Sequence, residues 1–264
     1  MKAAIPARVA LRGSITTPLV LRLALLAGAT ATLEALCVTG VIGGLTMQPP
    51  HRMVVDLARM LGSGAFNAAI ARTLWNVFLA VVAAMALGVA AAVVLKRLRR
   101  TREVLEPLFA TYYAIPVFAF YPLLIVLFGL GDVPQIFIGA MLGAVAVVVN
   151  TLNGLDRVPR VLTKTARVLR MGPFATAWRV TLPAAGPHVL AGLRLAVAYA
   201  FIGVIGAEFI MSNGGMGYEI GFAYNNFDNA TMYPLIVLIL MASIAVNTVL
   251  ARVENTLMAR RGLR

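Results

Sequence analysis

Six long apolar runs constrain the fold of this 264-residue sequence more than any other feature. Each is long enough to cross the hydrocarbon core of a bilayer as a helix, which takes about 20 residues. They occupy residues 23–46, 66–95, 107–130, 134–152, 189–211 and 233–250. Because a backbone in lipid must satisfy its own hydrogen bonds, such runs fold as helices. The sequence therefore predicts an all-α integral membrane protein with six transmembrane helices.

The composition agrees with this class and excludes a soluble domain. Hydrophobic residues make up 61% of the chain and charged residues only 12%. A net charge of +13 would indicate nucleic-acid binding in a soluble protein, but here the basic residues lie in short loops between apolar runs. We therefore expect membrane lipid, and no nucleic acid, as a partner. The single cysteine, Cys37, excludes an intrachain disulfide.

The distribution of basic residues predicts the orientation. Of the 23 Lys and Arg residues, the three loops on one side of the predicted membrane hold only Arg52, Arg59 and Arg72. By the positive-inside rule the other side is cytoplasmic. Both termini and the long polar loop of residues 156–187 are then expected on that side.

Three regions are predicted along the chain. Residues 1–64 form an N-terminal segment with the first span and an amphipathic stretch at 53–61, which predicts a helix at the membrane interface. Residues 65–258 form the core with five spans, and 259–264 are a basic tail. The alternative for the first run is a cleaved signal peptide ending near Ala29-Thr30-Ala31, but the run continues past that point.

The 156–187 loop is the most unusual polar segment. Arg160, Lys164 and Arg167 are spaced three to four residues apart and so share a helix face. Gly172-Pro173 is expected to end that helix, and a second short segment around Trp178 to stop at Pro183. Two short helices at a corner suggest a docking device. The alternative is a solvated basic loop that only fixes topology.

Enzyme chemistry is not expected in this chain. No phosphate-cradling G-x-x-x-x-G-K-[ST] motif occurs. His51 and His188 lie on opposite sides of the predicted membrane, and no Cys/His/carboxylate cluster has metal-ligand spacing. We therefore predict no catalytic residues, no metal site and no cofactor in the chain itself.

A transport path has better support. Pro116 and Pro122 interrupt the third run, and such breaks occur in membranes where the backbone meets protein or a watery cavity. Aromatic residues around them are expected to line a passage, although helix packing explains them equally well. The candidates for the path are Tyr112, Pro116, Phe120, Tyr121, Asn150 and Glu208.

At this point the sequence resembles a known family, the permease subunits of type I ATP-binding-cassette importers, and within it the nitrate/sulfonate/taurine branch. The resemblance covers roughly residues 48 to 258. It rests on these stretches: Pro49-Pro50, IPVFAFYPLLIVLFGLG (115–131), NTLNGL (150–155), LPAAGPHVLAGLRLA (182–196), GVIGAEFI (203–210) and GGMGYEI (214–220). It implies the permease fold of that family.

The family places Glu-Ala-Ala, a glycine four residues later and Leu-Pro in the loop between its fourth and fifth spans. Here those slots read Lys164-Thr165-Ala166, Arg170 and Leu182-Pro183, so we expect Gly172 to supply the corner instead. By resemblance the loop inserts a coupling helix into a separate ATPase, with Phe174 and Trp178 as apolar anchors. The implied docking residues are Lys164, Ala166, Arg170, Gly172, Pro173, Phe174, Trp178, Leu182 and Pro183.

The resemblance also implies partners and a mechanism. ATP-binding-cassette ATPase subunits would bind ATP and magnesium, and a periplasmic or extracellular solute-binding protein would deliver a small organic or anionic solute. A second permease copy, identical or divergent, would complete a path that works by alternating access in the bacterial inner membrane. Two other readings stay open: a secondary transporter coupled to ions through Glu34 and Glu208, and a structural membrane protein that transports nothing.

Overall fold

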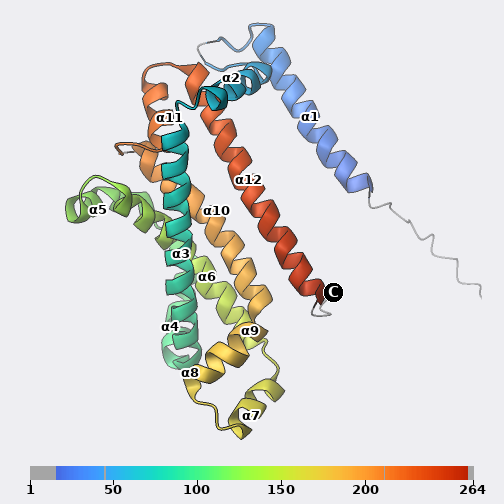
Figure 1. Cartoon of the computed structure of the whole chain (residues 1–264), viewed down its shortest axis with the longest axis vertical. Helices are drawn as coiled ribbons and strands as arrows, with labels where there is room; N and C mark the ends of the chain where they lie inside the picture. Colours follow the sequence, from blue (N-terminus) through green and yellow to red (C-terminus); the bar gives the residue numbers. More distant parts are fainter. Residues whose placement is uncertain (1–15, 45, 211, 261–264) are drawn as a thin grey trace, which may run out of the picture. The chain divides into compact units, whose positions relative to one another are not determined.

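The computed structural model describes residues 16–44, 46–210 and 212–260. Helix is the only regular structure found in these residues (Figure 1). The chain divides into two units, Met1–Val55 and Asp56–Arg264. The division falls inside helix α2 (Pro50–Ser63), which contains the amphipathic helix predicted at 53–61.

The first unit consists of α1 (Thr16–Val38) and the beginning of α2. Glu34 accepts a hydrogen bond of 3.1 Å from the backbone N–H of His51, and its carboxylate also contacts the His51 ring. This contact joins the last turns of α1 to the first turn of α2 and gives the charge a polar partner.

The second unit is a helical bundle around α3, α6 and α10 (Figure 1). In chain order its longer helices are α3 (Asn67–Arg97), α4 (Arg99–Thr111), α5 (Tyr121–Phe128), α6 (Asp132–Asp156), α10 (Gly186–Ile210), α11 (Met216–Asn225) and α12 (Asn229–Arg260). Short helices α7 to α9 lie at one end of this unit and α11 at the other.

Small residues let the three central helices approach closely. A Cβ atom added to Gly203 of α10 would lie 2.6 Å from the Cα atom of Gly139 in α6. One added to Gly88 of α3 would lie 2.6 Å from Cβ of Val147, and Gly143 faces Ala84. Gly139 and Gly143 are four residues apart on α6, the small-residue spacing that lets transmembrane helices approach closely.

The third predicted span is broken. The segment from Arg99 to Ala114 meets the segment from Val117 to Phe128 at an angle of 88°. The break is at Pro116, as predicted, which precedes the short helix η2 (Val117–Phe120). Pro122 does not break a helix, because it lies in the first turn of α5, where a missing N–H is tolerated.

The number of spans agrees with the prediction. Among the described residues five helices are long and apolar enough to cross a membrane, and a sixth span results when the bent pair is counted as one. The segment of residues 212–231, which lies between the fifth and sixth apolar runs, is not a plain loop. It contains α11, whose apolar residues Met216 and Ile220 pack against Leu235 of α12.

We expect Gly203→Ala to destabilise the second unit. The added methyl group meets backbone atoms of α6, which cannot rotate away, so the helices must separate at a cost of about 1–3 kcal/mol. A lower midpoint of thermal unfolding in detergent would show this. Gly62→Ala is the matched control, because nothing lies within 4 Å of its added Cβ. Equal midpoints for the two variants would contradict the packing argument.

Candidate functional site

The 156–187 loop folds into short helices that lead into α10. They are α7 (Arg160–Val168), α8 (Pro173–Thr176), the π-helix η3 (Ala177–Thr181) and α9 (Leu182–Ala184). Arg160, Lys164 and Arg167 lie on α7, as predicted. Pro183 was expected to stop the second segment, but it lies in the first turn of α9 and the chain continues into α10 at Gly186.

The corner after α7 is made by Arg170. Its backbone has φ 52°, in the left-handed region that normally favours glycine. The N–H of Met171 donates to the carbonyl of Ala166 at 3.0 Å, and the N–H of Arg170 to that of Arg167 at 3.0 Å. These two bonds are the Schellman pattern that closes a helix C-terminus.

The expectation that Gly172 supplies the corner is therefore wrong. Gly172 has φ −62° and ψ 160°, an extended conformation open to any residue, and precedes α8. Arg170 occupies the slot in which the resembling family places glycine. The slot favours glycine because it is the left-handed position after α7, but here an arginine adopts that conformation.

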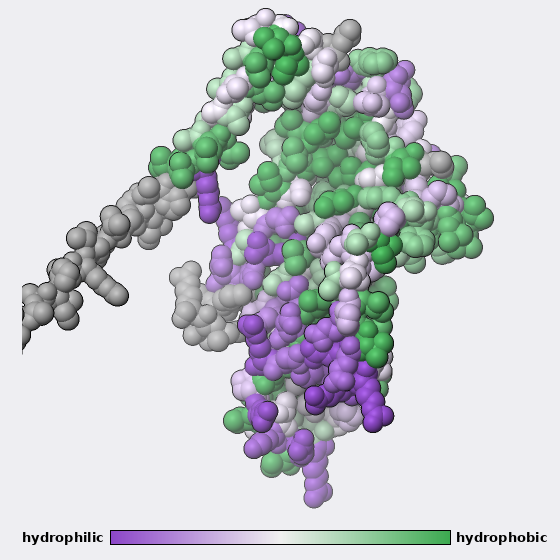
Figure 2. Space-filling view, turned by 180° about the vertical axis from the view of Figure 1, so that it is seen from behind, coloured by the Kyte–Doolittle hydropathy of each residue, from purple (hydrophilic) through white to green (hydrophobic). Residues whose placement is uncertain are grey.

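Large apolar side chains project from this loop. Phe174 is 78% exposed and Trp178 is 65% exposed. Other exposed apolar residues of the loop are Val161, Leu162, Val168 and Leu169. Figure 2 shows that hydrophilic residues gather toward this end of the second unit, with apolar residues among them. Such exposure is typical of a protein interface.

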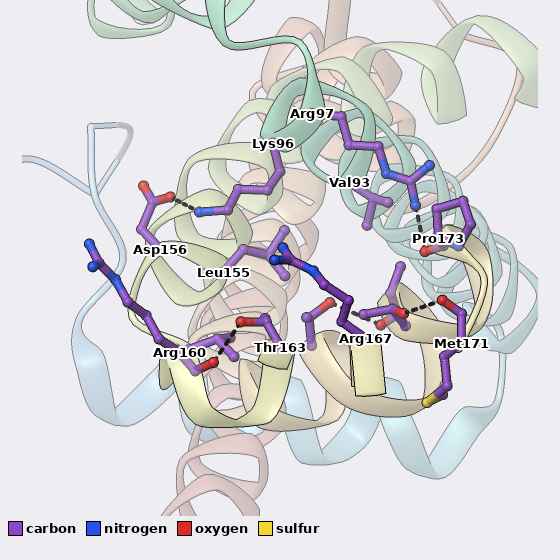
Figure 3. Close-up of a pocket in the computed structure, with 14 residues that line it drawn as sticks. Val93, Lys96, Arg97, Leu155, Asp156, Arg160, Thr163, Arg167, Met171 and Pro173 are labelled. Carbon is purple, nitrogen blue, oxygen red and sulfur yellow. Dashed lines mark hydrogen bonds and ion pairs between the residues drawn. The ribbon is translucent and has the colours of Figure 1, made fainter. Parts of the chain in front are cut away.

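Polar contacts join the loop to the ends of α3, α4 and α6. Asp156, the last residue of α6, forms ion pairs with Lys96 of α3 and with Arg102 of α4, the latter at 2.7 Å. The Arg97 guanidinium donates to the carbonyl of Pro173, the first residue of α8 (Figure 3). Movement of α8 is therefore linked to α3.

A pocket of about 400 Å³ lies beside the broken span. The rings of Tyr113 and Tyr199 stack there with centroids 4.8 Å apart. Asn150, a predicted path residue, lines the same pocket with Asn153 one helical turn later. We call it the tyrosine pocket. Nothing in the sequence indicates that Tyr199 lies near Tyr113. In contrast, the three-residue spacing of Asn150 and Asn153 indicates that these two residues share a helix face.

The other predicted path residues lie elsewhere. Tyr112 is half-buried and donates a hydrogen bond of 3.1 Å to the carbonyl of Met141. Pro116 is at the bend, and Phe120 is exposed in η2. Tyr121 is only 1% exposed and belongs to the core. Their place on a path stays a prediction.

Glu208 is fully buried, with 0% exposure. Its carboxylate accepts hydrogen bonds from the Thr73 hydroxyl at 2.8 Å and from the N–H of Gly217 at 3.0 Å. The Thr73 hydroxyl accepts in turn from the N–H of Met216 at 2.7 Å. Glu208 and Thr73 thus hold the first two N–H groups of α11, where a negative charge is favourable. A role of Glu208 in a path also stays a prediction.

Further polar contacts lie at the same end of the helical bundle as Glu208. Asp132 at the start of α6 accepts from Arg72 at 2.6 Å and from Asn76 at 2.9 Å. Gln135 accepts from Asn76 at 3.0 Å and donates to Ser212 at 2.7 Å. The described part of the chain contains no group of three or more His, Cys, Asp or Glu residues able to hold a metal ion.

Comparison with known proteins decides the family. Residues 84–261 match the family described as "Binding-protein-dependent transport system inner membrane component". The chain belongs to this family. The match covers the 156–187 loop, the tyrosine pocket and both helices that carry Glu208 and Asp132. The permease is thus a multi-pass protein of the cytoplasmic membrane. It belongs with the permease subunits of ATP-binding-cassette importers, in the nitrate/sulfonate/taurine branch, as the sequence motifs indicate.

Similar curated proteins point to one branch of the family. The permease is 29% identical over 181 residues to the putative aliphatic sulfonates transport permease protein SsuC of Bacillus subtilis (strain 168), covering 69% of this chain and 66% of that protein. It is 27% identical over 184 residues to the taurine transport system permease protein TauC of Escherichia coli (strain K12), covering 68% and 67%. The alignments thus span about two thirds of these relatives. The nitrate import permease protein NrtB of Synechococcus elongatus (strain ATCC 33912 / PCC 7942 / FACHB-805) is 30% identical over 121 residues, 46% of this chain and 43% of that protein.

We expect Arg170→Gly to stabilise the corner after α7. A left-handed conformation costs an L side chain about 1–2 kcal/mol, and part of this gain is lost because glycine makes the unfolded chain more flexible. Hydrogen exchange at the amides of Arg170 and Met171 should slow, corresponding to about 1 kcal/mol. Lys164→Gly inside α7 is the control and should speed exchange, since glycine destabilises a helix interior. Faster exchange in Arg170→Gly would contradict the assignment.

We expect Glu208→Ala to loosen α11. It leaves the Thr73 hydroxyl and the Gly217 N–H buried without an acceptor, at about 1–3 kcal/mol each. The thermal midpoint should fall, and the Met216 and Gly217 amides should exchange faster. Glu208→Gln keeps one acceptor and should lose less. Glu103→Ala, which removes an exposed pair with Arg99, is the control and should change little.

Proposed function

We propose that this permease is the membrane-spanning subunit of an ATP-driven importer. The observation that carries the proposal is the exposure of Phe174 and Trp178 on a polar loop. A large aromatic side chain left in water forgoes about 1.5–3 kcal/mol that burial would supply. Two such side chains on one short segment are suited to a groove on another protein. In this proposal that protein is the ATPase subunit, which would bind ATP and magnesium, and this chain would need no cofactor of its own.

The loop is connected so that a displacement of its docked end reaches the spans. η3 leads directly into α9, only Ala185 separates α9 from α10, and Arg97 links α3 to Pro173. Close-packed helices transmit displacement because they have little free volume to absorb it. A rigid-body shift of this kind supports alternating access. In this proposal the loop and both termini are cytoplasmic, and a solute-binding protein and a second permease copy complete the importer.

The tyrosine pocket supports a path for a small solute. Its volume of about 400 Å³ suits a small molecule, and its lining combines polar and charged side chains with apolar ones. The polar and charged residues are Tyr113, Tyr199, Asn150, Asn153, Arg102 and Glu106. The relatives are named for sulfonates, taurine and nitrate. We therefore propose a small organic or anionic solute for this permease.

An ion-gradient mechanism would need accessible carboxylates within the spans. Glu208 is enclosed and holds α11, and Glu34 contacts His51. Neither observation favours ion coupling, so ATP remains the proposed energy source.

The double variant Phe174→Ala/Trp178→Ala tests the docking surface. Interface anchors of this kind contribute about 2 kcal/mol or more each, so ATPase copurification should fall more than about tenfold. Solute uptake into vesicles that contain ATP and the ATPase, with no ion gradient, should fall with it. Wild-type uptake that requires an ion gradient instead of ATP would contradict the proposed function.

The matched control removes the same two residue types elsewhere. Trp75 and Phe78 of α3 stack with ring centroids 5.5 Å apart and are also exposed. Trp75→Ala/Phe78→Ala should leave ATPase copurification unchanged. Equal losses in the two double variants would show that the effect is a general defect and not docking.

A further inference from the structure

A cavity of about 670 Å³ lies between the 156–187 loop and the ends of α3 and α6. It is separate from the tyrosine pocket and from the exposed side chains of Phe174 and Trp178, which do not line it. Four basic residues line it, with one acid, Asp156. The four are Lys96, Arg97, Arg160 and Arg167.

The charge in this cavity is not balanced within the chain. Asp156 already pairs with Lys96 and Arg102. Arg97 donates to the Pro173 carbonyl, which is uncharged. Among the described residues no carboxylate lies within 4.0 Å of the side-chain nitrogens of Arg160 or Arg167. Figure 3 shows both arginines extending from α7 toward the end of α6.

The cavity lies where phosphate groups are available. It adjoins Arg97 and Asp156, the last residues of two candidate spans, and the ends of spans lie at the level of lipid headgroups. Guanidinium groups bind phosphate through two parallel hydrogen bonds, a geometry that suits two arginines on the same face of α7.

We propose that this cavity binds a phosphate-bearing anion, held by Arg160 and Arg167 with Arg97 and Lys96 nearby. The bound phosphate neutralises the α7 side of the cavity and ties the loop to the span ends. Two sources supply this chemistry, the headgroup of an anionic phospholipid and a free phosphate in the cytoplasm. The inference does not depend on the solute or on ATP coupling.

The test uses the full chain purified in detergent. Dioleoylphosphatidylglycerol is titrated against dioleoylphosphatidylcholine, and bound lipid is counted by native mass spectrometry. Arg160→Gln/Arg167→Gln should weaken binding of the anionic lipid about thirtyfold, because each basic residue contributes about 1 kcal/mol. Arg160→Lys/Arg167→Lys keeps the charge without the guanidinium geometry and should lose less. The lysine variant also allows the test to be made if the glutamine variant does not fold.

A matched pair of loop arginines outside the cavity provides the control. Arg157→Gln/Arg179→Gln makes the same change in net charge and should retain binding, since neither residue lines the cavity. Equal losses in the two pairs would overturn the proposal, because binding would then follow overall charge. The proposal would also be overturned if both lipids bound equally well and inorganic phosphate had no effect.

Two further arms identify the source and the competing occupant. If inorganic phosphate raises the thermal midpoint in phosphatidylcholine, and does so only with Arg160 and Arg167 present, the source is free phosphate. If only phosphatidylglycerol acts, the source is the lipid. Stoichiometric displacement of the lipid by the ATPase subunit would show that the cavity is a protein-docking surface, and would overturn the inference.

Discussion

The rest of the second unit depends on the backbone contact between α6 and α10. Gly139 and Gly203 leave no room for a Cβ atom, and Gly143 and Gly88 extend the close approach to α3. In lipid the hydrophobic effect does not draw helices together, so van der Waals contact between backbones must do so. The central helices are therefore fixed as a group, and the features at either end are positioned by them.

The two ends of this group are held in different ways. At one end, buried polar side chains hold α11, with Glu208 and Thr73 bonded to its first N–H groups. Buried hydrogen bonds of this kind are costly to break, so this end is rigid. At the other end, exposed ion pairs at Asp156 join the loop to the spans. Exposed pairs contribute little and re-form easily, which is compatible with the coupling role proposed for this loop.

Much of the fold follows from the sequence because lipid imposes simple rules. The spans and the break at Pro116 were predicted from run length and from proline. The four-residue spacing of Gly139 and Gly143 is itself a sequence signal for close packing. The helix α11 was missed because Gly214, Gly215 and Asn225 are typical of loops, while its stability comes from Glu208, a tertiary contact. Tyr199 was missed for the same reason, since it joins Tyr113 only after α10 packs beside the broken span.

The corner at Arg170 shows why the family usually places glycine at this position, although the residue here is arginine. The Schellman bonds from Met171 and Arg170 require one left-handed residue, and they form here although the residue is arginine. The two bonds must therefore offset a conformational cost of about 1–2 kcal/mol. Since the corner geometry survives, the direction of the chain into α8 is set by the helix end and not by glycine. What arginine changes is the stability of the corner and the local charge. The loop therefore keeps its shape, and the proposed docking surface beside the corner becomes more basic.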